Sequence, residues 1–121
     1  MSLRPRLRFS SAMRLKQSRE FARVRSGGQR SAKGCLIANW MPSGSGLKLG
    51  VITSKKVGTA VARARARRLL REAFRLHQHE IRQPLDLVLV ARPSISGKAF
   101  TEVERDFLSL LRQANLMRLA G

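Results

Sequence analysis

The first regular pattern of apolar residues along the chain has the spacing of a helix. Leu15, Ser18, Phe21, Ala22 and Val24 follow a helix-like spacing, and basic residues fill the other faces. A glycine pair at residues 27–28 follows this pattern. Because glycine commonly ends a helix, we expect the first helix to end before this pair.

The next two patterns are typical of strands. Residues 33–41 (KGCLIANWM) and 47–53 (LKLGVIT) are rich in residues that favour strands, and a turn rich in Pro, Gly and Ser lies between them. We therefore expect these two strands to pair as a hairpin. The pattern also leaves room for one further short strand near Arg30.

The longest predicted helix covers residues 58–79, which contain no proline and no interior glycine. At about 100° per residue, one side of this helix is apolar and the other is cationic. The apolar side contains Ala62, Ala66, Leu69, Leu70, Ala73 and Leu76, and the cationic side contains Arg63, Arg67, Arg68, Arg71 and Arg75. We expect the first side to face the core and the second to form a ridge of positive charge.

Two further elements complete the pattern. Residues 85–91 (LDLVLVA) form an apolar run with the length of a buried strand, and residues 97–117 carry apolar side chains at spacings of three and four. A helix between two strands predicts a β-α-β crossover, which in most proteins is right-handed. The sequence thus predicts a flexible basic tail over residues 1–12 and a single α+β domain over residues 13–118.

Net charge is the feature of the composition that most restricts the function. The 121 residues contain 25 Lys and Arg against 7 Asp and Glu, for a net charge of +18. So large an excess is usually balanced by a polyanion, and guanidinium groups, which are numerous here, both grip phosphates and stack on bases. RNA is therefore the expected partner, well ahead of an anionic membrane.

Residues that could carry other chemistry are few. Cys35 is the only cysteine, which excludes an intrachain disulfide, and no apolar run is long enough to cross a bilayer. We expect a soluble protein of the reducing cytoplasm. His77 and His79 lie two residues apart, on different sides of a helix, and the seven acids form no cluster. We expect neither a catalytic side chain nor a metal site in the protein itself.

The most specific signal is the stretch 48–75, in which a strand leads through Lys55 and Lys56 into the arginine-rich helix. Acids that would pair with a merely solvated helix face are nearly absent, since only Glu72 lies there. This stretch resembles the signature of the ribonuclease P protein family. The matching residues are Ser54-Lys55-Lys56, Val57-Gly58, Ala60-Val61, Arg63, Arg65, Arg67-Arg68, Arg71-Glu72 and Phe74. A looser resemblance extends over about residues 14–114.

The resemblance implies both a fold and a function. The fold would be a mixed four-stranded sheet with three helices in the order α-β-β-β-α-β-α, with a left-handed crossover through the basic helix. The function would be that of the protein subunit of ribonuclease P, which binds a catalytic RNA subunit and the 5′ leader of precursor tRNA. Leader removal would depend on Mg²⁺ held mainly by the RNA subunit, with no organic cofactor and no obligate protein partner.

The resemblance also implies which residues bind RNA. The residues expected to bind the RNA subunit are Lys55, Lys56, Arg63, Arg65, Arg67, Arg68 and Arg71. Those expected to bind the leader are Phe21, Arg25 and Trp40. The chain departs from the family pattern twice: Ala64 replaces an asparagine of the signature, and Arg25 stands where the family often has an aromatic residue.

Two other classes of protein share some of these features. A structural ribosomal protein would have the same size, charge and arginine-rich helix, and copurification with ribosomal subunits would favour it. A protein-only nuclease would cleave RNA with Mg²⁺ in the absence of any RNA subunit, although the shortage of acids disfavours it.

Overall fold

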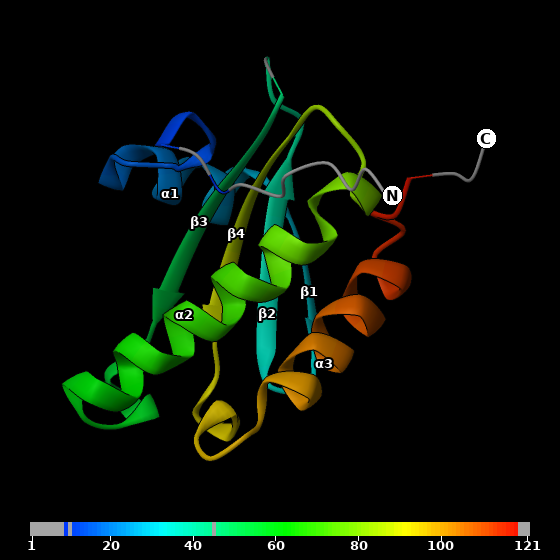
Figure 1. Ribbon diagram of the computed structural model, residues 1–121. Coiled ribbons are helices and arrows are strands. Elements are labelled where there is room, and N and C mark those ends of the chain that lie inside the picture. The colour runs from blue at the N-terminus through cyan, green and yellow to red at the C-terminus, as the bar shows by residue number, and fades with distance from the viewer. Residues whose placement is uncertain (1–8, 10, 45, 119–121) are drawn as a thin grey trace.

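The computed structural model describes residues 9, 11–44 and 46–118. Within them, three α-helices and four strands follow one another in the order α-β-β-β-α-β-α, as the family resemblance implied (Figure 1). The elements are α1 (Ser18–Gly27), β1 (Gln29–Lys33), β2 (Leu36–Met41), β3 (Leu47–Thr53), α2 (Ala60–His77), β4 (Leu85–Ala91) and α3 (Phe100–Gln113). Short 3-10 helices, among them Lys55–Val57 and Pro93–Ile95, lie in the connections.

The four strands form one mixed sheet in the order β1-β2-β4-β3. The predicted hairpin between β2 and β3 is wrong, because β4 lies between them and pairs antiparallel with β2 and parallel with β3. Nearly every residue of β4 is buried, and a strand that is apolar on both faces is stable in the centre of a sheet and not at its edge. The hairpin that does form joins β1 to β2 through Gly34, which has a φ of +56°.

The connection from β3 through α2 to β4 has the less common hand. Figure 1 views the sheet from the side on which α2 lies, with β3 and β4 both running downward and β4 to the right of β3. That arrangement makes the crossover left-handed. The hand implied by the family resemblance is confirmed, and the right-handed crossover expected from general chain rules is not observed.

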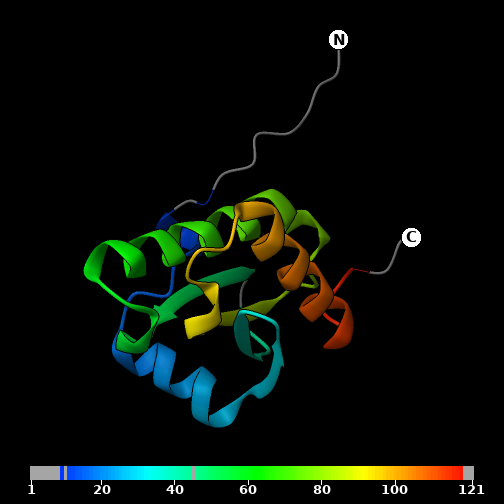
Figure 2. The same ribbon diagram turned by 90° about the horizontal axis from the view of Figure 1, so that it is seen from below.

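Helices cover the two faces of the sheet unequally. α2 and α3 lie on one face, and the shorter α1 lies on the other (Figure 2). The main core, which includes the fully buried Phe74 and Phe107, lies under α2 and α3. A smaller cluster of Leu15, Val24 and Val88 lies under α1. Because α1 is short, part of its face of the sheet stays uncovered.

The phase of α2 agrees largely with the prediction. Its fully buried residues are Ala66, Leu70, Ala73 and Phe74, while Leu69 and Leu76 are only half-buried. Ala64 is exposed, as expected for a residue among the arginines. The helix begins after Thr59, whose hydroxyl accepts a hydrogen bond of 3.1 Å from the backbone N–H of Ala62.

The N-terminal segment is attached to the domain before α1 begins. Of the predicted tail, residues 1–8 and 10 lie outside the described residues. The Phe9 ring contacts the Phe74 ring edge to face, with 5.5 Å between the centroids. The backbone N–H of Leu15 donates to the Leu49 carbonyl at 3.0 Å, which delays the start of α1 to Ser18. Phe9 therefore already belongs to the packed part of the chain. In the described part of the chain, no helix is long and apolar enough to cross a membrane.

Candidate nucleic-acid interface

The uncovered part of the sheet has an apolar surface. Ile37, Val90 and Ile52 are neighbours in register on three adjacent strands, and each is only half-buried. They point to the face that α1 covers in part, because side chains alternate between the two faces along a strand. Solvent therefore reaches a row of apolar side chains beside α1.

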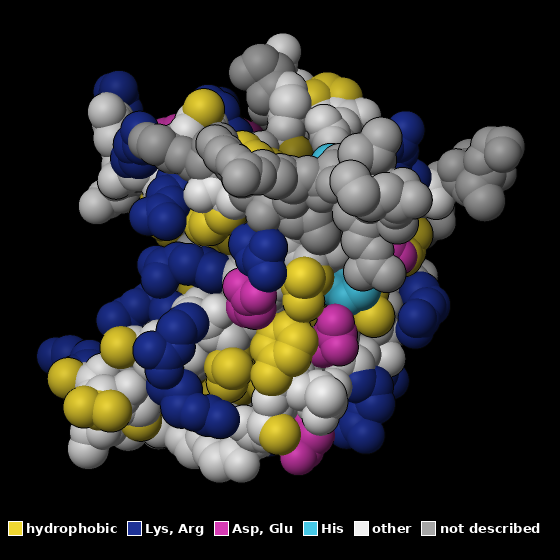
Figure 3. Space-filling model, in the orientation of Figure 1, with side chains coloured by type: hydrophobic (Ala, Val, Ile, Leu, Met, Phe, Trp, Pro, Cys, Tyr) yellow, Lys and Arg dark blue, Asp and Glu magenta, His cyan; other side chains and the backbone are white. Residues whose placement is uncertain are grey.

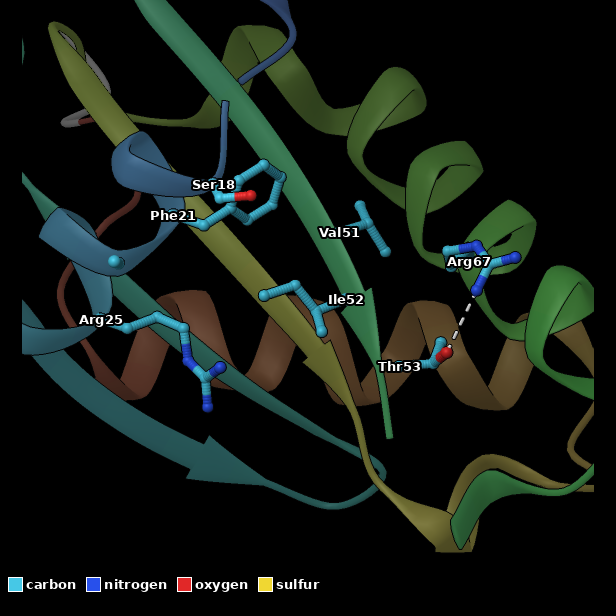
Figure 4. A pocket seen from close by; sticks show the side chains of 8 residues that line it. Ser18, Phe21, Arg25, Val51, Ile52, Thr53 and Arg67 are labelled. Carbon is cyan, nitrogen blue, oxygen red and sulfur yellow. Dashed lines mark hydrogen bonds between the residues drawn. The ribbon is translucent and has the colours of Figure 1, made fainter. Parts of the chain in front are cut away.

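Two clefts adjoin along this side of α1. One has a volume of about 490 Å³ and lies between α1, the end of β3 and α2 (Figure 4). The other has a volume of about 350 Å³ and lies over β1, β2 and β4. Ala22 and Arg25 line both clefts. We call the two clefts together the α1 groove. It is long, open to solvent, and apolar along its floor.

Phe21 lies in the wall of the α1 groove. Its ring sits so close to Gly50 that a Cβ atom at position 50 would overlap it, which explains the glycine in the middle of β3. The ring is half-buried and also lines the larger cleft, where Figure 4 shows it beside Val51 and Ile52. Phe21 thus fixes α1 to the sheet and offers an aromatic surface to the groove.

Arginine side chains flank the apolar floor. Arg25 extends from α1 over the groove, and Arg30 on β1 lines its other end. Arg67 reaches the groove from α2, where its Nη1 donates a hydrogen bond of 3.2 Å to the hydroxyl of Thr53 (Figure 4). The sequence had assigned Arg67 to the RNA-subunit surface alone. In the structure it lies between that surface and the α1 groove.

The basic residues of α2 and of the loop before it differ in how far they reach into solvent. Lys55, Lys56 and Arg68 are exposed. Arg65 turns the other way, and its Nη2 donates to the Lys98 carbonyl at 2.8 Å. Arg63 is half-buried, and its Nε has no hydrogen-bond partner among the described residues. Positive charge therefore gathers on the solvent side of the N-terminal half of α2 and on the loop before it.

Arg71 lies in a strongly positive environment. Burial lowers the pKa of its guanidinium, and the nearby charges of Arg14 and Arg67 lower it further. The Arg14 guanidinium also lies 4.8 Å from the centre of the Phe9 ring. Sequence reasoning missed Arg14, because only the folded chain brings the N-terminal segment to α2.

Asn39 is a second polar residue that the sequence did not single out. It is 4% exposed. Its side chain lines the smaller cleft together with that of Ile37, which lies two residues earlier on β2. Leu36 and Ala38 face the main core. Because side chains alternate along β2, Asn39 must face the α1 groove, and the sequence could have shown this once the core face of β2 was known.

The structure separates Trp40 from the other residues predicted to bind the leader. Trp40 is 6% exposed and belongs to the core under α2 and α3. Phe21 and Arg25 lie on the opposite face of the sheet. The grouping of Trp40 with these two is therefore corrected. The physical reason is the two-residue period of β2, which turns Trp40 away from the groove.

The first twelve residues of α2, residues 60–71, contain no Asp or Glu. In the view of Figure 3, Lys and Arg side chains gather over the N-terminal half of α2, and Asp and Glu side chains lie toward α3. Glu72 pairs with Arg75 on α2, and Glu104 of α3 accepts from Nε2 of His77 at 2.8 Å. Arg67, which lies on α2 and lines the larger cleft, connects the basic residues of α2 with the α1 groove.

Known proteins show the same sequence pattern. A family model described as Ribonuclease P matches residues 9–115. The chain is 38% identical over 104 residues to the ribonuclease P protein component of Caldanaerobacter subterraneus subsp. tengcongensis, and the match covers 85% of this chain and 90% of that protein. It is 33% identical over 108 residues to that of Alkaliphilus oremlandii, with 88% and 95% covered.

Solved structures show the same fold. The RNase P protein of Staphylococcus aureus superposes with a TM-score of 0.81 at 24% identity, covering 89% of this chain and all of that one. The RNase P protein of Thermotoga maritima superposes with a TM-score of 0.75 at 26% identity, covering 83% and 96%. The mixed sheet and its three helices are therefore the fold of these proteins.

Proposed function

Because the chain belongs to the ribonuclease P protein family, we propose that it is the protein subunit of a ribonucleoprotein that removes the 5′ leader of precursor tRNA. In this proposal the protein has two RNA-binding surfaces. The basic residues around the N-terminal half of α2 bind the catalytic RNA subunit, and the α1 groove binds the leader.

The observation that carries the proposal is the chemistry of the α1 groove. A single strand of RNA presents unstacked bases and a row of phosphates. The groove offers an apolar floor with the Phe21 ring for the bases, and Arg25 and Arg67 at its sides for the phosphates. Single-stranded nucleic acid is bound in this way by aromatic platforms beside positive charge.

We assign the phosphodiester hydrolysis to the RNA subunit and to Mg²⁺ bound mainly by it. The carboxylates that would be needed for a metal centre in the protein serve other contacts. Asp86 bonds to Arg23 at 2.8 Å, Asp106 accepts from the Cys35 backbone N–H at 3.0 Å, and Glu72 pairs with Arg75. The role of the protein is therefore to bind and orient.

A reconstitution experiment tests this function. With the matching RNA subunit, the protein should strengthen binding of leader-bearing precursor tRNA more than binding of mature tRNA, and it should lower the Mg²⁺ concentration needed for cleavage. The purified protein alone should not cleave precursor tRNA at any Mg²⁺ concentration. Cleavage by protein free of RNA, or equal effects on both tRNA forms, would contradict the proposal.

A further inference from the structure

Asp86 is a buried carboxylate beneath α1, on the same face of the sheet as the groove. It lies on β4 and is 3% exposed. Its Oδ2 accepts a hydrogen bond of 2.8 Å from Nη2 of Arg23, which lies on α1. Its Oδ1 is buried and has no partner among the described residues, although Lys48 is its cross-strand neighbour on β3.

Few contacts hold α1 on the sheet. All ten residues of α1 are described, and among them only Val24 is fully buried. Phe21 adds its contact with Gly50, and Arg23 adds the ion pair with Asp86. The side chain of Arg23 is 60% exposed, so the ion pair contributes little apolar packing. Its effect is on the orientation of the helix.

The ion pair and the groove lie on opposite flanks of α1. With about 100° between successive residues, Arg25 falls on one side of Val24 and Arg23 falls on the other. Phe21 and Arg25 line the groove together with Ala22 (Figure 4). Arg23 instead bonds to Asp86. A rotation of α1 about its own axis, with Val24 as the pivot, would therefore break the ion pair and shift the groove wall together.

The incomplete hydrogen bonding of Asp86 argues against a purely stabilising role. A buried carboxylate oxygen without a donor costs free energy, and an apolar side chain of similar size often serves stability as well or better. Such a carboxylate does fix the position of its partner, because the alternative is an unpaired buried charge.

We propose that Asp86 is a positioning residue for the leader, which acts by holding Arg23 so that α1 keeps the rotation that aligns Phe21 and Arg25 along the groove. The inference rests on the proposed function of the groove. It adds that the ability to distinguish leader-bearing from mature tRNA depends on a residue that does not itself touch the RNA.

Two substitutions test the inference in the reconstituted enzyme: Asp86→Asn and Arg23→Gln. Each should reduce, roughly tenfold, the ratio of affinities for leader-bearing and mature tRNA, because small displacements of positioning groups have large effects. Affinity for the RNA subunit should change less than about twofold, since the N-terminal half of α2 is not involved. The double variant should be no worse than Asp86→Asn alone, because both residues act through one contact.

Matched controls separate positioning from charge and from stability. Arg19→Gln removes the same charge from an exposed position of α1 that does not bond to Asp86. Asp106→Asn alters the other buried aspartate, which binds the Cys35 backbone on the far side of the sheet. Neither control should change the ratio of affinities, although Asp106→Asn should lower the free energy of unfolding.

The outcomes are distinguishable. If Arg19→Gln reduces the ratio as much as Arg23→Gln, Arg23 acts only through its charge and the inference is overturned. If the unaltered protein shows no preference for leader-bearing tRNA, the proposed function fails instead. If Asp86→Asn does not fold, the exposed Arg23→Gln carries the test. Amide hydrogen exchange adds a second measurement: exchange should accelerate in α1 with Arg23→Gln and not with Arg19→Gln, and an unchanged rate would also reject the inference.

Discussion

Phe21 packs on Gly50 and also lines the α1 groove, and one substitution can separate these roles. Phe21→Leu keeps an apolar side chain over Gly50 but removes the ring on which a base can stack. We expect leader-bearing tRNA to bind more weakly by about 1–3 kcal/mol, the contribution of one stacked base, and mature tRNA to bind as before. Equilibrium binding of both RNAs to the reconstituted enzyme measures the difference.

Trp40 provides the control for this prediction. Because it is buried in the core on the opposite face, Trp40→Phe should lower the free energy of unfolding by about 0.5–3 kcal/mol and leave the binding of the leader unchanged. If Trp40→Phe weakened leader binding as much as Phe21→Leu, the assignment of the groove to the leader would be untenable.

Ala64 stands where the family resemblance implies an asparagine, and it is exposed among the arginines of α2. Ala64→Asn should therefore be accepted at a helix-propensity cost of about 0.5 kcal/mol. An amide that hydrogen-bonds to the RNA subunit should contribute about 1 kcal/mol, several-fold in affinity. The gain should persist at high salt, because a neutral amide releases no counterions. Parallel salt titrations of the two proteins check this, and unfolding of the variant would show that the helix phase is wrong.

At the scale of elements, His77 joins the end of α2 to α3. Its Nδ1 bonds to Glu80 and its Nε2 to Glu104, and only a protonated imidazole can donate from both nitrogens. Burial lowers the pKa of His77, but the two carboxylates outweigh burial, and the net effect is a pKa above the ordinary value of 6.5. The stabilisation is therefore complete below pH 6.5 and is lost as the pH rises through the raised pKa.

Urea unfolding at a series of pH values tests this link between the helices. The unaltered protein should lose on the order of 1 kcal/mol of unfolding free energy as the pH rises from 6 through the raised pKa of His77. His77→Gln, which cannot gain a proton, should lose markedly less over the same interval. Parallel curves for the two proteins would show that the pair of contacts adds no stability.

The elements also show how far the sequence determines this fold. Periodicity located α2 and the burial of β4, because those patterns are local. It failed for the partners of β2 and β3, since strand order depends on which strand is apolar on both faces, and that became clear only for the assembled sheet. The left-handed crossover was predicted by the family resemblance and by no local pattern.

The candidate site was predictable to a similar extent. Phe21 and Arg25 were expected to share a surface, and the structure brings them together beside β3. Arg14 and Asn39 were missed, because their places depend on contacts between segments far apart in the sequence. Trp40 was expected beside Phe21 and Arg25 as an aromatic residue that could stack on a base, but the alternation of β2 turns its side chain to the other face.

For the whole molecule, the net charge of +18 predicts a strong salt dependence of binding to the RNA subunit. If the basic surface neutralises about five to eight phosphates, log K should fall with log salt at a slope of roughly −4 to −7. Arg68→Ala should reduce the magnitude of this slope by about one, whereas Arg105→Ala on the exposed side of α3 should not. A slope near zero would rule out the electrostatic account of binding.

The place of β4 in the sheet has a consequence for how the protein forms. β4 is one of the two inner strands, yet the chain reaches it only after β1, β2, β3 and α2. Until residues 85–91 are available, β3 lacks its strand partner and α1 lacks Asp86 and Val88 beneath it. Folding must therefore close long loops before the contacts between the strands can form. The entropy lost in closing them slows folding relative to a helical protein of this size. A nascent chain in which residues 85–91 have not yet been synthesised would carry most of the positive charge, but it would lack both of the ordered surfaces that we propose bind RNA.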